Sequence, residues 1–245
     1  MRALVLLHGF LGLPSAWDGL RARLPSDVAV LAPALAGHAG APPAGSYEEE
    51  VERLGDLVLK SGLEAPHLVG YSLGGRLALG LLARWPGHFS GATLLSARLA
   101  LRSQAEREAR VQADEALAER LLTGGLGAFL SAWDAQPLFA SQAALPEAQL
   151  RAWREARGIH APEAVVCGLR ALSLGRMPDE SAALSRFEGP VAVLAGALDP
   201  KFVALAPELA AALPRSTWSI VPGAGHNLPL EAPASVASAL PWSVS

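Results

Sequence analysis

The fold of this chain is decided by the stretch Leu68-Val69-Gly70-Tyr71-Ser72-Leu73-Gly74-Gly75-Arg76. It contains the pattern Gly-x-Ser-x-Gly around Ser72, between an apolar run and a segment with the apolar spacing of a helix, residues 77–82. A serine on a sharp turn from strand to helix is a nucleophile elbow. Such a turn strains the serine backbone, and glycines two residues before and after it prevent collisions of side chains. The stretch therefore predicts a reactive serine at the end of a strand.

Short apolar runs alternate with helical patterns on both sides of this stretch. Strands are expected at 3–7, 28–31, immediately before Ser72, and at 92–96, 191–194 and 217–221. One helix is expected to start near Pro14 and to carry Leu20 and Leu24, and a second to span 46–62 with Ser46 as its N-cap. Strands that alternate with helices are typical of a doubly wound, mostly parallel sheet.

The alternation stops between Arg98 and Arg186. This segment carries helical apolar stripes and no convincing strand. We therefore expect a core formed by 1–97 and 187–245, interrupted by a helical insertion, 98–186. Because ligands bind outside the carboxyl ends of the strands in such sheets, the insertion is expected to act as a lid.

The composition sets limits on the function. The 245 residues are 51% hydrophobic and carry a net charge of −3, so no global positive charge favours nucleic acid. The single cysteine, Cys167, excludes an internal disulfide, and we expect it to be a buried thiol. No apolar run is long enough for a membrane span, and the N-terminal run is too short for a signal peptide. We therefore expect a soluble, cytoplasmic protein.

A serine hydroxyl needs an imidazole to activate it, and the imidazole needs a carboxylate to orient it. Ser72, Asp199 and His226 occur in the chain order of the elbow enzymes, and each follows an expected strand. Taken singly, Asp199 could be a solvated turn residue and His226 a capped loop residue. Four further histidines have no comparable placement and are expected at the surface or in loops: His38, His67, His88 and His160.

An oxyanion hole needs two backbone N–H groups. One is expected from Leu73, the residue after the serine. The other is assigned to Phe10, in the loop after the first strand, where the side chain of His8 is expected to hold the loop by hydrogen bonding.

With these motifs the chain resembles the α/β-hydrolase superfamily and, within it, the 2-succinyl-6-hydroxy-2,4-cyclohexadiene-1-carboxylate synthases of menaquinone biosynthesis. The matching segments are residues 69–76, 136–141, 199–202 and 224–227. The resemblance implies a mostly parallel sheet flanked by helices, with an inserted helical lid. Most members have two strands before the His-Gly loop. Met1 leaves no room for them, so the sheet is expected to have six strands unless the start codon is misassigned. The loop 35–40 also lacks the usual Pro-Gly-His-Gly.

The family eliminates pyruvate from a cyclohexene that bears several carboxylates, with the triad serine as base, and the resemblance implies no cofactor and no metal. Its substrate arginines fall on Arg76, Arg110 and Arg157, and its pocket aromatics on Tyr71 and Trp133. Arginine suits carboxylates because its planar fork binds them through two hydrogen bonds.

Other roles for the arginines stay open. Arg110 could pair with Asp114 one turn later, and Arg157 could be favoured by a helix C-terminus. Arg76 lies in the first turn of a helix, where a cation is disfavoured, which strengthens a functional explanation.

Other functions stay open as well. The same residues could form a carboxylesterase or a carbon–carbon bond hydrolase with Ser72 as the nucleophile, or a ligand receptor without catalysis. The expected partner is a small polycarboxylate, with neither nucleic acid nor membrane, and the expected state is a monomer or small homo-oligomer.

Overall fold

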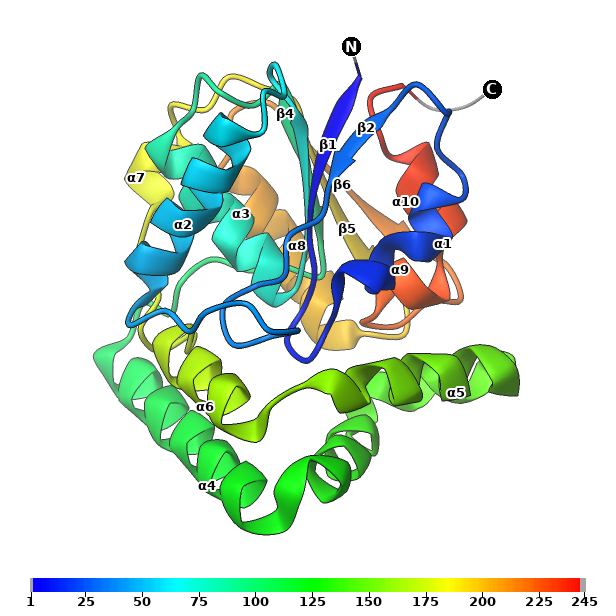
Figure 1. The fold of residues 1–245 in the computed structure, drawn as a ribbon. Coiled ribbons are helices and arrows are strands. Elements are labelled where there is room, and N and C mark those ends of the chain that lie inside the picture. Colours follow the sequence, from blue (N-terminus) through cyan, green and yellow to red (C-terminus); the bar gives the residue numbers. More distant parts are fainter. Residues whose placement is uncertain (1, 243–245) are drawn as a thin grey trace.

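The structure, a computed structural model, describes residues 2–242, and its centre is a six-stranded parallel sheet (Figure 1). The strand order is β2-β1-β3-β4-β5-β6. The strands are β1 (Ala3–Leu7), β2 (Ala29–Leu31), β3 (His67–Tyr71), β4 (Gly91–Leu95), β5 (Val191–Gly196) and β6 (Ser216–Val221). The predicted fold class, a parallel six-stranded sheet flanked by helices, is confirmed.

Helices cover both faces of the sheet (Figure 1). One face carries α2 (Tyr47–Lys60), α3 (Leu73–Arg84), α7 (Ser181–Leu184) and α8 (Pro200–Ala211). The other carries α1 (Asp18–Arg21), α9 (Leu228–Glu231) and α10 (Pro233–Ser238). β1, β3 and β4 are buried along their whole length between these layers, which explains their continuous apolar sequence. The expected N-cap is also present, because Ser46 Oγ accepts a hydrogen bond of 3.2 Å from the Glu49 amide.

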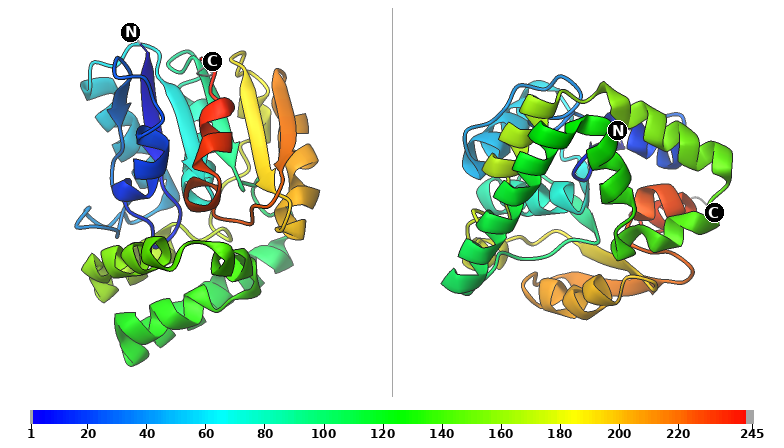
Figure 2. Two further views of the ribbon diagram at one scale, coloured as in Figure 1. Left: turned by 90° about the vertical axis from the view of Figure 1, so that its right-hand side faces the viewer. Right: turned by 90° about the horizontal axis from the view of Figure 1, so that it is seen from below.

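The segment between β4 and β5, every residue of which the structure describes, contains helices and no strand. It comprises α4 (Gln104–Asp134), the 3₁₀ helix η2 (Pro137–Ala144), α5 (Glu147–Ala156), the 3₁₀ helix η3 (Arg157–Ile159) and α6 (Pro162–Ala171), followed by α7. α4 bends at Gly125, whose φ is 75°. The part from α4 to α6 lies across the carboxyl ends of the strands (Figure 2). Among the described helices, none is both long and apolar enough to cross a membrane.

Two predicted details are wrong. The helix expected from Pro14 through Leu24 is a 3₁₀ turn, η1 (Pro14–Trp17), followed by the single turn of α1, which ends at Arg21. Cys167 is exposed rather than buried, because it lies on the outer side of α6 while Val166 and Leu169 face the interior.

The placement of one histidine differs from the prediction as well. His38, His67 and His160 were expected at the surface or in loops; His38 and His160 do lie in loops, but all three are at most 3% exposed. His67 belongs to β3, and the other two are buried where the helical insertion packs on the core. Burial between segments far apart in the sequence leaves no pattern around a single histidine.

Candidate active site

Ser72 occupies the sharp turn between β3 and α3. Its φ is 50° and its ψ is −108°, a strained conformation for a residue with a side chain. The turn depends on neighbouring glycines. A Cβ on Gly70 would lie 2.6 Å from the carbonyl oxygen of Gly74, and a Cβ on Gly74 would collide with the carbonyl oxygen of Leu7. Side chains at these positions would therefore force the turn open.

The structure brings Ser72, His226 and Asp199 together from three strand ends. His226 Nε2 lies 3.1 Å from Ser72 Oγ, and His226 Nδ1 lies 2.7 Å from Asp199 Oδ2. A carboxylate only accepts, so Nδ1 carries the proton and donates to Asp199. Nε2 is then free to accept the proton of the Ser72 hydroxyl. This is the arrangement that makes a serine hydroxyl reactive.

Several contacts fix the imidazole. The hydroxyl of Ser96 donates a 2.9 Å hydrogen bond to the carbonyl oxygen of His226. Asp199 is also the N-cap of α8, since its Oδ1 accepts from the Phe202 amide at 3.2 Å. The rings of Phe202, Tyr71 and Phe139 lie 4.6, 5.4 and 5.9 Å from that of His226. The last ring comes from η2, so the helical insertion shields the histidine from solvent.

Two backbone amides next to Ser72 are available to an oxyanion. Within residues 2–242, the N–H groups of Phe10 and Leu73 donate to no protein acceptor. The loop that carries Phe10 is held as expected by His8, whose Nδ1 lies 2.8 Å from the Gly9 carbonyl oxygen. The Nε2 atom of His8 accepts from the Leu35 amide at 3.1 Å. Burial lowers the pKa of His8 to about 4, so the ring is neutral at pH 7.

A cavity of about 320 Å³ lies between Ser72 and the helical insertion. Its walls combine apolar and aromatic groups with cations. The lining includes the predicted residues Phe10, Tyr71, Ser72, Leu73, Arg76, Arg110, Trp133 and His226, together with Arg98, Asp114, Phe139, Lys201 and Phe202.

Arg76 and Arg110 both line this cavity, but each also has a protein partner. Arg76 donates to the carbonyl oxygen of Leu172 at 2.9 Å, at the C-terminus of α6. The negative end of that helix offsets the unfavourable position of the cation in the first turn of α3. Arg110 Nε lies 2.9 Å from both carboxylate oxygens of Asp114, which also accepts from Ser173 Oγ at 2.6 Å. The alternative considered for Arg110, an ion pair with Asp114, is therefore present, and the paired guanidinium still borders the cavity.

The structure does not bring Arg157 to the main cavity. It is 2% exposed and binds Asp134 through two hydrogen bonds, of 2.9 and 2.5 Å. Its guanidinium lies 4.9 Å from the ring of Trp153. It borders a small adjoining cavity of about 20 Å³, shared with Tyr71 and Trp133.

Arg98 and Lys201 are cavity cations that the sequence analysis missed. Neither forms a salt bridge with any carboxylate in the described part of the chain. Arg98 lies two residues after the end of the strand expected at 92–96, and Lys201 lies two residues after Asp199. Position at the carboxyl edge of the sheet could therefore have identified both.

Burial and the mutual repulsion of the positive charges around the cavity lower the pKa of Arg76 and of Lys201. Burial, followed by the charge of Arg110, lowers the pKa of Arg76 to about 10. Partial burial, Arg98 and Arg110 lower the pKa of Lys201. Opposite charge relieves such crowding, so the cavity favours an anionic ligand. In the described residues no group of three His, Cys, Asp or Glu side chains could hold a metal ion.

A Ser-His-Asp arrangement on a strained strand–helix turn, at the carboxyl edge of a parallel sheet, defines the class of α/β-hydrolase-fold enzymes. The chain belongs to the alpha/beta hydrolase family, whose model matches residues 4–239.

Individual relatives within that family carry more specific names. The chain is 33% identical over 235 residues to a "Putative 2-succinyl-6-hydroxy-2,4-cyclohexadiene-1-carboxylate synthase" of Bacillus subtilis, covering 94% of this chain and 86% of that protein. It is 35% identical to the 2-succinyl-6-hydroxy-2,4-cyclohexadiene-1-carboxylate synthase of Enterobacter sp., with 97% and 89% covered. Among solved structures, MenH from S. aureus aligns with a TM-score of 0.88 at 28% identity, with 96% and 90% covered. A malate-bound thermophilic esterase from Thermogutta terrifontis aligns with a TM-score of 0.79 at 25% identity, with 96% and 86% covered.

Proposed function

We propose that this protein is a carbon–oxygen lyase of menaquinone biosynthesis that eliminates pyruvate from a succinyl-cyclohexene polycarboxylate; relatives named 2-succinyl-6-hydroxy-2,4-cyclohexadiene-1-carboxylate synthase support the proposal. One observation carries the proposal: the triad serine faces a cavity bordered by four cationic side chains, Arg76, Arg98, Arg110 and Lys201. A substrate with several carboxylates matches this charge.

In the proposed reaction Ser72 acts as a base. His226 Nε2 takes the hydroxyl proton, and Ser72 Oγ removes a proton from the substrate carbon next to a carbonyl. The negative charge moves to the carbonyl oxygen, where the amides of Phe10 and Leu73 stabilise it. The electron pair then returns to form a ring double bond, and the carbon–oxygen bond breaks with its electron pair on the leaving oxygen. The protonated His226 gives its proton to this leaving enolate, which departs as pyruvate, and Ser72 keeps the proton taken from the substrate, so both residues return to their starting state. Asp199 keeps the imidazole oriented and stabilises its positive form.

Binding of the substrate is assigned to the cations and aromatics around the cavity. Arg76 and Arg110 supply guanidinium groups to carboxylates, and Tyr71 and Trp133 pack against the ring. Arg157 would join them by exchanging Asp134 for a substrate carboxylate. We further propose that the insertion, 98–186, is a lid over a core formed by 1–97 and 187–245.

The test is the release of pyruvate from the succinyl-cyclohexene substrate, followed with lactate dehydrogenase and NADH. Purified protein is expected to release pyruvate with saturation kinetics, and Ser72→Ala is expected to abolish this. If the wild-type protein leaves the substrate unchanged while it rapidly hydrolyses p-nitrophenyl acetate, the lyase proposal is wrong.

A serine hydrolase is the second candidate, with Ser72 as nucleophile. The same triad and the same amides would stabilise a tetrahedral intermediate, and the structural similarity to an esterase favours this alternative. Its discriminating feature is a covalent acyl-enzyme, which mass spectrometry would detect and which the lyase reaction never forms.

We infer that the protein acts in the cytoplasm as a monomer or small homo-oligomer. No cofactor is proposed, because proton abstraction and elimination need only the groups named above.

A further inference from the structure

Leu11, in the loop after β1, has an unusual backbone for a buried leucine. Its φ is 58° and its side chain is fully buried. A leucine rarely adopts positive φ, and such a conformation persists only where the surrounding groups fix it. Leu11 directly follows Phe10, the proposed oxyanion donor, so the groups that fix it lie next to the reaction centre.

Two histidines hold the backbone of Leu11. Its N–H donates to His38 Nε2 at 3.1 Å, and its carbonyl oxygen accepts from His160 Nε2 at 3.2 Å. Because His38 Nε2 accepts, its proton lies on Nδ1, which donates to the Ala36 carbonyl oxygen at 2.9 Å. His160 has the opposite tautomer, since its Nδ1 accepts from the Ala39 amide at 3.2 Å. Burial lowers the pKa of both rings, in agreement with their neutral state.

These histidines and His8 fix three successive peptide planes. The C=O and N–H of one peptide group point in opposite directions. His8 and the Gly12 amide both donate to the Gly9 carbonyl oxygen, at 2.8 and 2.9 Å, and so direct the Phe10 N–H the other way. His38 fixes the next plane through the Leu11 N–H, and His160 fixes the third through the Leu11 carbonyl.

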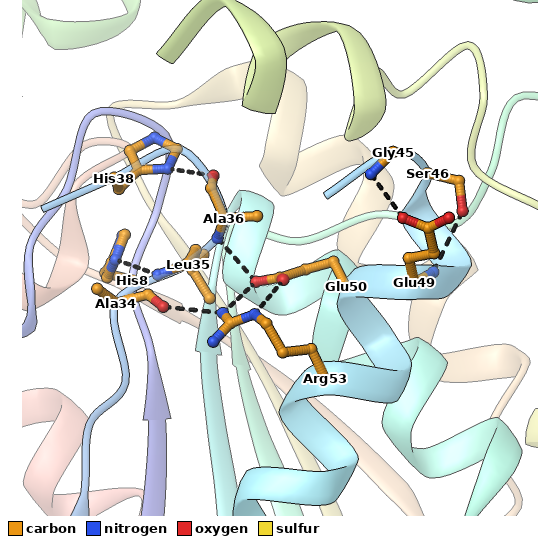
Figure 3. Close-up of polar contacts among 10 residues, drawn as sticks. All are labelled: His8, Ala34, Leu35, Ala36, His38, Gly45, Ser46, Glu49, Glu50 and Arg53. Atoms are coloured by element: carbon orange, nitrogen blue, oxygen red, sulfur yellow. Dashed lines mark hydrogen bonds and ion pairs between the residues drawn. The ribbon is translucent and has the colours of Figure 1, made fainter. Parts of the chain in front are cut away.

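The second ring nitrogens of His8 and His38 bind the backbone of the loop 34–36, which is itself tied to α2. Figure 3 shows His8 against Leu35 and His38 against Ala36. The Ala36 amide donates to the buried carboxylate of Glu50 at 2.8 Å. Arg53 pairs with Glu50 and donates to the Ala34 carbonyl oxygen, which ties this loop to α2 (Figure 3). His38 thus joins this loop, which is tied to α2, to the oxyanion loop.

His160 differs from the other two because it comes from the helical insertion, between η3 and α6. Its ring packs edge-to-face on that of His38, with 5.4 Å between the centroids. The Leu11 side chain belongs to the hydrophobic cluster of the insertion, which includes Leu121 and Phe129 of α4 and Val165 of α6. Both the backbone and the side chain of Leu11 therefore depend on where the insertion lies.

We propose that His160 and His38 are positioning residues that link the helical insertion to the oxyanion hole, by fixing the peptide groups on either side of Leu11 and thereby the Phe10 amide. The inference rests on the proposed role of that amide. Docking of the insertion over the strand ends would complete the oxyanion hole at the same time as it covers the substrate.

The experiment compares two ligands on His160→Ala. Phenylboronic acid, which forms a tetrahedral anion on the serine, needs the oxyanion amides, whereas succinate needs only the cations of the cavity. Since loss of an oxyanion donor costs about a hundredfold or more in rate, its displacement is expected to weaken boronate binding about tenfold. The Kd of succinate is expected to stay within about twofold of the wild-type value, and turnover to fall in kcat rather than KM.

Two variants separate positioning from stability. His160→Gln, whose side-chain amide can still donate to the Leu11 carbonyl, is expected to recover most of the boronate affinity. His67→Ala, which removes a buried histidine bonded to Thr93 at the other end of β3, is expected to lose stability and keep boronate affinity. A folded His160→Ala protein that binds phenylboronic acid as tightly as the wild type overturns the inference. A wild-type protein that binds the boronate but releases no pyruvate overturns the lyase proposal. The comparison of His160→Ala with the wild type still decides the positioning role of His160.

A measurement on the wild-type protein needs no variant. Long-range ¹⁵N–¹H spectra of histidine-labelled protein at pH 7 are expected to show neutral His38 with its proton on Nδ1 and neutral His160 with its proton on Nε2. The reverse tautomer or a charged ring at either residue overturns the inference.

Discussion

Replacement of His67 by glutamine is expected to make the protein more resistant to acid. His67 begins β3 and is 3% exposed, and its Nε2 lies 2.8 Å from Thr93 Oγ1. Its Nδ1 is buried and has no partner within residues 2–242. Burial lowers the pKa of His67 from 6.5 to about 4, because a charged imidazole would lose its hydration there.

The sign of the effect follows from proton binding. Between pH 6.5 and pH 4 the unfolded chain protonates His67 and the folded chain does not, so acid favours unfolding. The stability associated with the neutral ring is fully present above pH 6.5 and decreases as the pH falls. The slope is about 1.4 kcal/mol per pH unit, and the loss by pH 4 is about 3 kcal/mol. His8, whose pKa is lowered to a similar value, contributes in the same direction.

The assay is urea unfolding at a series of pH values from 7.5 to 4.5, for the wild type and His67→Gln. Glutamine can keep a hydrogen bond to Thr93 and cannot titrate, so the curve of the variant is expected to be flatter below pH 6.5. At pH 5 the two free energies of unfolding are expected to differ by about 2 kcal/mol relative to their difference at pH 7.5. Parallel curves would show that the ring is protonated in the folded protein and would refute the reasoning.

Three further predictions concern the site and its surroundings. Asp199→Asn is expected to lower kcat about ten-thousandfold while the protein stays folded, because an amide favours the wrong tautomer of His226; steady-state kinetics decide, and a decrease of less than about tenfold would contradict the role of Asp199. Arg98→Gln and Lys201→Met are each expected to raise KM for the polycarboxylate about tenfold and to leave hydrolysis of p-nitrophenyl acetate unchanged; equal losses on both substrates would place these residues in the fold rather than in binding. Glu180→Gln is expected to raise Tm at pH 8 but not at pH 5. Burial and then Glu48 raise the pKa of Glu180 to about 7, so the folded state loses stability as the pH rises from 4.5 to 7. An equal change in Tm at both pH values would exclude this cause.

The fold and the meeting of the triad residues were predictable from the sequence for one physical reason. In a parallel sheet all strands end at the same edge, so residues that follow strands are brought together however far apart they are in the chain. Ser72, Asp199 and His226 each follow an apolar run that is easy to recognise. The order of the apolar runs along the chain predicted how the strands are connected, and the glycines around Ser72 predicted the sharp turn.

The surroundings of the triad were not predictable in the same way. His38 and His160 contact Leu11 across 27 and 149 positions of sequence, and nothing local marks either residue as buried. The outward direction of Cys167 depends on which side of α6 meets the core. Arg157 was predicted from the resemblance to the family, but its pairing with Asp134 joins η3 to the end of α4 across 23 positions of sequence. Packing within the insertion and its docking on the core, neither of which local sequence encodes, decide all of these.

The charge of the cavity bears on which reaction this triad performs. Ser72, His226 and the two amides would serve a nucleophilic serine and a basic serine equally well, so their geometry cannot separate the two. The cavity borders four cations against one carboxylate, Asp114, which leaves three positive charges in excess. An esterase gains little from this excess, because an acyl pocket is apolar and the partly buried cations Arg76, Arg98 and Arg110 lose part of their hydration. A substrate with several carboxylates recovers that cost on binding. The excess of positive charge is therefore better matched to an anionic substrate than to an apolar acyl group, and it favours the lyase.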